Sequence, residues 1–132
     1  MPGEAPERPD RLVVLSEPDF AEAVRDALRD YARPHELADS PLLRSRLVME
    51  RAGEDDRVEA LRALLNEAAE ELNATPREAP YYLAVDATYL DPARTQAEAA
   101  AQLDMPFSSF RRYLKRGIEH VVEALWQREL AA

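Results

Sequence analysis

Four cationic side chains lie close together near the end of this sequence: Arg111, Arg112, Lys115 and Arg116. Guanidinium and ammonium groups suit two kinds of target, the phosphate oxygens of a nucleic acid and the acceptor atoms on base edges. On a helix that advances 100° per residue, Ser108, Arg111, Arg112 and Lys115 fall on one side, with Arg116 at its edge. The spacing therefore predicts a basic face on the first two turns of a helix, the part of a DNA-reading helix that enters the major groove.

The opposite side of the same stretch is apolar and predicts a buried face. Its members recur at three- and four-residue spacing: Phe110, Leu114, Gly117, Ile118, Val121 and Leu125. Pro106 suits the first helical position, where no backbone N–H is needed. We therefore predict a last helix that starts at Pro106 and continues to about Glu129.

A shorter helix is predicted to precede this one and to be joined to it by a tight turn. Thr95 and Glu98 have the spacing of a capping box, in which a hydroxyl and a carboxylate bind the free N–H groups of the first turn. Ala99 and Ala100 supply the small residues that a crossing helix requires, and Asp104 tolerates a left-handed φ in the turn. The pair predicts a helix-turn-helix with four buried contacts between its helices: Leu103, Met105, Phe110 and Leu114.

This stretch resembles the helix-turn-helix of sigma-factor region 4 and of the LuxR-type regulators over about residues 80–118. The matching residues are Thr95, Gln96, Glu98, Ala99, Ala100, Leu103, Met105, Ser108, Ser109, Phe110, Arg111 and Arg112. The sequence departs from the pattern at Asp104, where Gly is usual, at Pro106, where a capping Ser is usual, and at Phe107, which is often polar. The Asp104 carboxylate weakens the DNA interpretation because it would lie near the path of a phosphate.

The resemblance implies a set of DNA-binding residues. They are Thr95, Gln96, Ser108, Ser109, Arg111, Arg112, Lys115 and Arg116. Arg111 or Arg112 would bind guanine O6 and N7 in bidentate fashion, whereas Lys115 and Arg116 would contact phosphate. The two serines would meet a phosphate at the helix N-terminus, and Thr95 and Gln96 would face the DNA backbone. The implied function is sequence-specific binding of double-stranded DNA by a regulatory protein.

The net charge of the whole chain, −9, favours a second interpretation. All of this excess lies in residues 1–94, because residues 95–132 contain equal numbers of acidic and basic side chains. An acidic body repels phosphate, although at about 0.15 M salt charges more than roughly 8 Å away are largely screened. Glu119 also lies on the basic face, one turn beyond Lys115. The alternative is therefore an interaction adaptor, whose helix-turn-helix docks a larger ATPase or a transcription component.

Features outside the helix-turn-helix bear on this alternative. Residues 15–34 and 40–48 resemble segments that precede such a motif in larger bacterial ATPase or regulatory proteins. Trp126 lies at the edge of an apolar stripe, where it belongs either to the core or to a homodimer or partner interface. We expect residues 12–75 and the tail around Trp126 to provide any such contact.

The composition predicts an all-α protein of about six helices. Ala and Leu carry most of the 46% hydrophobic content and β-branched residues are sparse. Helix starts are predicted at Ser16, Ser40, Asp55-Asp56, Pro80, Thr95 and Pro106. Pro34 is expected to end the first helix and Gly53 the second, and the fourth is expected to continue to Leu90. Leu12 to Leu15 reads as a strand or a helix start. The expected organisation is a disordered tail at 1–11, a support or dimerisation part at 12–75 and a helix-turn-helix domain at 76–132.

Several other functions are not expected. The three Gly form no phosphate-binding loop, Cys is absent and no Ser, His and Asp form a catalytic pattern, so no enzyme activity and no cofactor are predicted. His35 and His120 are far apart and do not have metal-ligand spacing. No segment is apolar enough to cross a membrane, and the acidic start lacks the features of a secretory signal. A cytoplasmic protein is expected, and the Ala- and Arg-rich usage is typical of a GC-rich bacterial genome.

Overall fold

Every regular element that the structure describes is a helix. The computed structural model describes residues 11–132, so the tail predicted at 1–11 lies, apart from Arg11, outside the described residues. The α-helices are α1 (Glu17–Arg29), α2 (Pro34–Leu37), α3 (Arg46–Ala52), α4 (Arg57–Glu70), α5 (Ala79–Val85), α6 (Gln96–Gln102) and α7 (Phe107–Ala131). Three single turns complete the chain, η1 (Pro41–Arg44), η2 (Glu71–Ala74) and η3 (Asp86–Leu90). The prediction of an all-α fold is confirmed.

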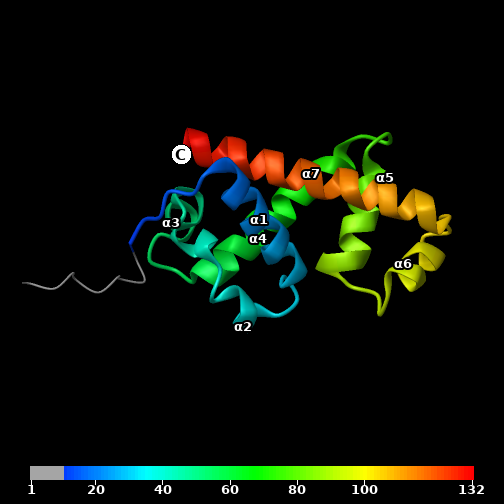
Figure 1. Cartoon of the computed structure of the whole chain (residues 1–132), viewed down its shortest axis with the longest axis horizontal. Helices are drawn as coiled ribbons and strands as arrows, with labels where there is room; N and C mark the ends of the chain where they lie inside the picture. The colour runs from blue at the N-terminus through cyan, green and yellow to red at the C-terminus, as the bar shows by residue number, and fades with distance from the viewer. Residues whose placement is uncertain (1–10) are drawn as a thin grey trace, which may run out of the picture.

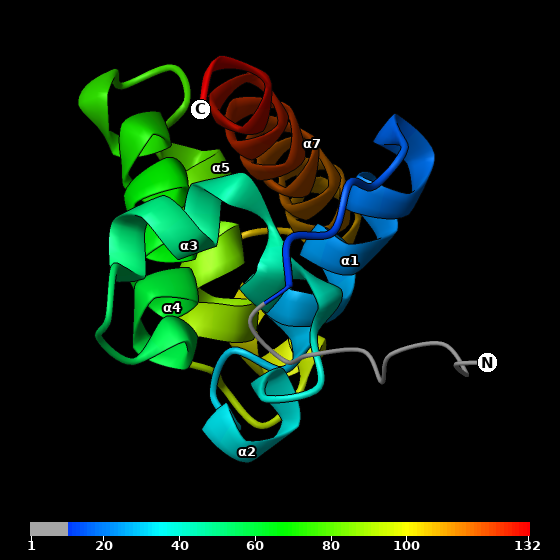
Figure 2. The same cartoon turned by 90° about the vertical axis from the view of Figure 1, so that its left-hand side faces the viewer.

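The last helix, α7, runs along the whole length of the molecule (Figure 1). It contacts α1, α3, α4, α5 and α6, so nearly every layer of the fold packs against it. Figure 2 shows α1 on one side of α7 and α3 with α4 on the other. The predicted buried face is confirmed: Phe110, Leu114, Gly117, Val121 and Leu125 are buried, and Ile118 is partly buried.

Local capping explains several of the helix ends. The Ser16 hydroxyl accepts a hydrogen bond from the Asp19 N–H at 3.3 Å and begins α1. The Asp56 carboxylate accepts from the N–H groups of Val58 (2.9 Å) and Glu59 (3.4 Å) and begins α4. Gly53 ends α3 with a φ of 58°. The predicted helix starts at Ser16 and Asp56 and the predicted helix end at Gly53 are confirmed. Each of them depends only on residues within one turn.

The first helix ends earlier than predicted, and Pro34 begins a helix instead of ending one. α1 stops at Arg29, and Pro34 is the first residue of the short α2. Arg33 adopts φ −127° and ψ 79°, outside the helical region. The physical reason is that the proline ring disfavours helical backbone at the preceding residue but suits a first helical position.

The start predicted at Ser40 belongs to a 3-10 turn, and α3 starts five residues later. Ser40 caps η1 by accepting from the Leu42 N–H at 3.2 Å. The buried Ser45 hydroxyl then donates to the Leu42 carbonyl at 2.6 Å and accepts from the Val48 N–H at 3.3 Å. One side chain, that of Ser45, therefore ends the turn and begins the helix.

Leu12 to Leu15 form neither a strand nor a helix.

The fourth predicted helix, Pro80 to Leu90, changes its hydrogen-bonding pattern after Val85. In η3 the Asp91 N–H donates to the Asp86 carbonyl at 2.8 Å, the five-residue spacing of a π-turn. The Thr88 hydroxyl donates to the Ala84 carbonyl at 2.7 Å, a side-chain bond that competes with the backbone pattern.

The last helix also differs slightly from the prediction. Pro106 is its N-cap and not its first residue, and the helix continues to Ala131.

Candidate nucleic-acid interface

The turn between α6 and α7 has the geometry that the sequence predicts. The Thr95 hydroxyl accepts from the Glu98 N–H at 3.0 Å and caps α6. Asp104 has a φ of 55°, the left-handed conformation expected for this position. The Met105 N–H donates to the Ala100 carbonyl at 2.9 Å and the Asp104 N–H to the Ala101 carbonyl at 3.1 Å. These two hydrogen bonds form a Schellman motif, which ends α6 before the chain enters α7.

Apolar contacts hold the two helices and α5 together. Ala99 and Ala100 are buried where α6 packs, as predicted from their size. Of the four predicted contacts, Phe110 and Leu114 are buried, whereas Leu103 and Met105 are partly buried against the core. Both α5 and α6 contact α7, and α6 also contacts η3, so this part of the fold presents the outer face of α7.

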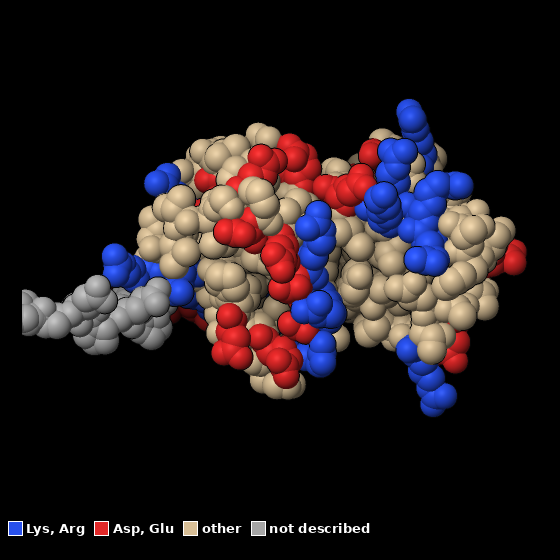
Figure 3. Space-filling view, viewed as in Figure 1, with Lys and Arg blue, Asp and Glu red and all other residues tan. Residues whose placement is uncertain are grey.

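The predicted basic face is exposed and lies on the first turns of α7. Ser108, Arg111, Arg112, Lys115 and Arg116 are exposed, and Ser109 is partly buried. Figure 3 shows cationic side chains gathered over the end of the molecule that holds α6 and the start of α7, and acidic side chains over the middle. Aromatic rings support two of the guanidinium groups, with Arg111 Cζ 5.9 Å from the Phe107 ring centroid and Arg112 Cζ 5.4 Å from that of Tyr113.

Ion pairing distinguishes the basic face from several arginines of the acidic body. Five body or tail arginines pair with a carboxylate, in the pairs Arg29–Asp26, Arg33–Asp30, Arg51–Glu67, Arg62–Glu59 and Arg128–Glu71. Within residues 11–132, Arg111, Arg112, Lys115 and Arg116 have no carboxylate within 4.0 Å. The positive charge of the face is therefore available to an anionic partner.

A groove of about 320 Å³ lies beside this face and joins three helices. Its lining is Gln96 from α6, Arg111, Leu114, Lys115, Ile118 and Glu119 from α7, and Arg25 from α1. The structure therefore brings together Gln96, Arg111 and Lys115 among the predicted site residues. Thr95 is occupied as a cap, and the other four predicted residues do not line the groove.

Arg25 is the groove residue that the sequence prediction missed. It lies in the acidic part of the chain, about 70 residues before α6, and no motif marks it. Its exposed position on α1, opposite buried Val24, Ala27 and Leu28, is a local signal that agrees with a solvent-facing side chain. Only the packing of α1 against α7 shows that it reaches the basic face.

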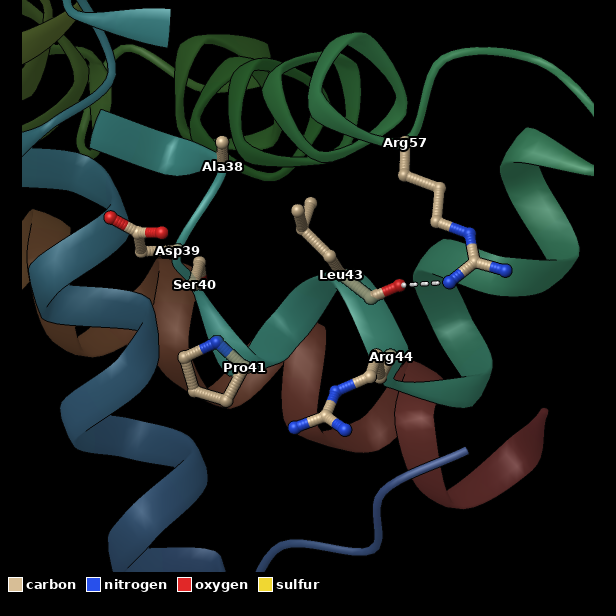
Figure 4. A pocket seen from close by; sticks show the side chains of 7 residues that line it. All are labelled: Ala38, Asp39, Ser40, Pro41, Leu43, Arg44 and Arg57. Atoms are coloured by element: carbon tan, nitrogen blue, oxygen red, sulfur yellow. Dashed lines mark hydrogen bonds between the residues drawn. The ribbon is translucent and has the colours of Figure 1, made fainter. Parts of the chain in front are cut away.

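A hollow of about 470 Å³ lies elsewhere, between the α2–η1 segment and the start of α4 (Figure 4). Its lining includes Ser40, Pro41, Arg44 and Arg57. Figure 4 shows the Arg57 guanidinium turned to the Leu43 carbonyl, to which Nη1 donates at 3.4 Å. This cation is therefore engaged by the protein's own backbone.

The histidines and the acidic residues form pairs and not a cluster. His35 Nε2 lies 3.5 Å from Glu36, and His120 Nε2 lies 3.1 Å from Glu71. Across residues 11–132, His, Asp and Glu side chains form no group of three that could hold a metal ion. In the same range, none of the helices is both long enough and apolar enough to span a bilayer.

Comparison with known protein families, curated protein sequences and solved structures finds no match to this chain. The resemblance of residues 80–118 to sigma-factor region 4 and LuxR-type domains therefore stays a hypothesis drawn from the sequence.

Proposed function

We propose that this chain is a sequence-specific DNA-binding regulatory protein that inserts the first turns of α7 into the major groove. The observation that carries the proposal is the contrast in ion pairing. Arg111, Arg112, Lys115 and Arg116 lie together, are exposed and have no carboxylate partner among the described residues, whereas four arginines of the acidic body, Arg29, Arg33, Arg51 and Arg62, are paired. An uncompensated cationic face on a helix held by a tight turn suits a polyanion.

The residues of the face have two roles in this proposal, base reading and phosphate binding. Arg111 and Arg112 reach base edges, where a guanidinium donates to guanine O6 and N7. Lys115 and Arg116 lie further along α7 and bind phosphate, which fixes orientation without reading sequence. Ser108 lies in the first turn of α7, where unpaired backbone N–H groups also favour a phosphate.

The acidic body orients the molecule on DNA in this proposal. Most of the acidic side chains in the view of Figure 3 lie over the middle, where some cationic side chains also lie, and fewer lie at the end that holds α6. A phosphate backbone repels that region, whereas at about 0.15 M salt the repulsion falls off within roughly 8 Å. The duplex is therefore favoured only at the basic end.

The test is duplex binding as a function of salt. The native chain is first used to select preferred sequences from a random duplex pool, and its affinity for selected and random duplexes is then measured by fluorescence anisotropy. Counterion release predicts that log K falls linearly with log salt, with a slope of about −0.9 for each phosphate contact. Arg111→Ala/Arg112→Ala should remove the preference for the selected duplex and weaken binding.

The matched control is Arg46→Ala/Arg51→Ala, which removes the same charge from α3, at the opposite end of the molecule from α6 (Figure 1). The control should retain the sequence preference. Absence of any duplex binding at about 50 mM salt, or equal losses in the two double variants, would contradict the proposal.

A protein adaptor is the second candidate, favoured by an exposed apolar surface at the other end of α7. Val14 is 80% exposed and Leu130 is 59% exposed, and both line a hollow of about 200 Å³ together with Trp126. Trp126 itself packs on Phe20, with ring centroids 5.2 Å apart. A partner or second copy bound there would leave the basic face open, so this candidate is distinguished by substituting Val14 and Leu130 with Ser and measuring oligomeric state by sedimentation.

A further inference from the structure

We infer that α1 is part of the DNA interface and that Arg25 binds a backbone phosphate beside Gln96 and Lys115. This inference rests on the proposed function. It adds a contact from outside the helix-turn-helix, in a part of the chain that the sequence assigns to support. It also predicts where the duplex backbone passes, along the groove between α1 and the start of α7.

The first support is convergence of polar groups from three helices. Arg25, Gln96, Arg111 and Lys115 line one groove, although Arg25 and Gln96 lie on separate helices. In a helix-turn-helix complex the first helix of the motif crosses the DNA backbone while the second enters the major groove. Gln96 is the first residue of α6, so the groove lies where a backbone strand leaves the major groove. A guanidinium at this place meets phosphate oxygens.

The second support is that Arg25 is not neutralised by the acidic residues of its own helix. Asp26 pairs with Arg29 at 3.0 Å and Asp30 with Arg33 at 2.7 Å, and Glu22, three residues before Arg25, does not lie within 4.0 Å of it. Arg25 is exposed and, within the described residues, has no carboxylate within 4.0 Å. Its positive charge therefore adds to that of Arg111 and Lys115.

The third support is the rigid position of α1. Val24, Ala27 and Leu28 are buried in the core, and the Phe20 ring packs at a tilt against Trp126 of α7. α1 contacts both α7 and η3. Because α1 is held against α7 along its length, Arg25 approaches DNA as part of the same rigid body as the basic face. A positioned side chain loses less entropy on binding than one on a flexible segment.

Glu119 limits how far the phosphate path extends. It lines the same groove as Arg25, one turn of α7 beyond Lys115. A phosphate close to Glu119 would be repelled, so the favourable place lies on the side of Gln96 and Arg25. Glu119→Gln removes the repulsion without removing the side chain and should tighten DNA binding.

The experiment compares Arg25→Ala with Arg46→Ala in the full chain. Both residues are exposed, and each substitution removes one positive charge, but Arg46 lies on α3. Loss of one phosphate contact reduces the salt slope by about one and weakens binding equally for selected and random duplexes. We expect this result for Arg25→Ala and the native slope for Arg46→Ala. Circular dichroism and urea unfolding verify that both variants fold as the native chain does.

The outcomes separate this inference from the proposed function. If Arg111→Ala/Arg112→Ala loses sequence preference while Arg25→Ala keeps the native slope, α1 is not part of the interface and the proposed function stands. Equal changes in Arg25→Ala and Arg46→Ala would show a general effect of net charge and would also overturn the inference. If the native chain binds no duplex, the proposed function fails, and the inference fails with it.

Discussion

Gly117 of α7 lies so close to Val85 of α5 that a Cβ atom on Gly117 would be 2.4 Å from Val85 Cγ2. The same Cβ would lie 2.9 Å from the carbonyl oxygen of Tyr81. Absence of a side chain at one position therefore sets the distance between α5 and the helix that carries the basic face. The proposed DNA-binding surface depends on this contact, because α5 supports α7 from behind.

Gly117→Ala should destabilise the protein by about 1–3 kcal/mol, the usual range for overpacking a core. In a helix without a close neighbour the same change stabilises by about 1 kcal/mol, so the sign of the effect is informative. The free energy of unfolding in urea is the measurement. Val85→Ala combined with Gly117→Ala should recover part of the loss, because the nearer of the two clashing atoms is then removed. A more stable Gly117→Ala variant would show that the helices lie further apart.

Asp104→Gly should stabilise the protein by about 1 kcal/mol. Asp104 has a φ of 55°, which is costly for residues with a Cβ and free of that cost for Gly. Asp104→Asn is the matched control. Asn tolerates the left-handed conformation as Asp does but carries no charge, so this substitution should change stability little. Asp104→Ala should lose about 1 kcal/mol. Thermal unfolding of the three variants distinguishes a backbone effect from a charge effect.

Glu129 should contribute about 1–2 kcal/mol to stability as a long-range cap. Its carboxylate accepts from the backbone N–H groups of Arg46 at 3.2 Å and Leu47 at 2.8 Å, the first two residues of α3. Glu129→Ala leaves those donors without this partner, and Glu129→Gln, with one oxygen left to accept, should lose less. Glu123→Ala, on the exposed side of the same helix, is the control and should change the urea midpoint little. Equal effects in the two Ala variants would contradict the cap.

Asp86→Asn should stabilise the protein at pH 7 and have little effect in acid. Burial, then the carboxylates of Asp91 and Glu70, raise the pKa of Asp86 above its usual range. A raised folded-state pKa means that the folded protein binds the proton more tightly, so the ionised carboxyl costs stability above that pKa. The cost fades as the pH falls through the folded pKa and is absent below the ordinary Asp value of about 3.9. Urea unfolding of both proteins from pH 7 to pH 4 should show the difference shrinking, and a constant difference would exclude this cause.

Local features of this fold were predictable because they depend on residues three or four apart. The Thr95 cap, the left-handed Asp104 and the two faces of α7 follow from spacing and side-chain type, and the structure confirms each. The early end of α1 and the separate α2 were missed because the effect of Pro34 on Arg33 competes with an otherwise continuous helical pattern. The π-turn at η3 has a comparable cause in Thr88, whose hydroxyl binds a backbone carbonyl.

The sequence by itself determined an all-α chain whose last helix carries an apolar face and, on its first turns, an opposite basic one. The ion pairs between distant residues, Arg51–Glu67 and Arg128–Glu71, were decided only by the tertiary structure. Arg25 lines the same groove as Lys115, 90 positions later in the chain. Glu129 caps α3 at Leu47, 82 positions earlier, and Gly117 leaves room for Val85, 32 positions earlier. The physical reason is that helical periodicity states which side of a helix is buried but not which helix covers it.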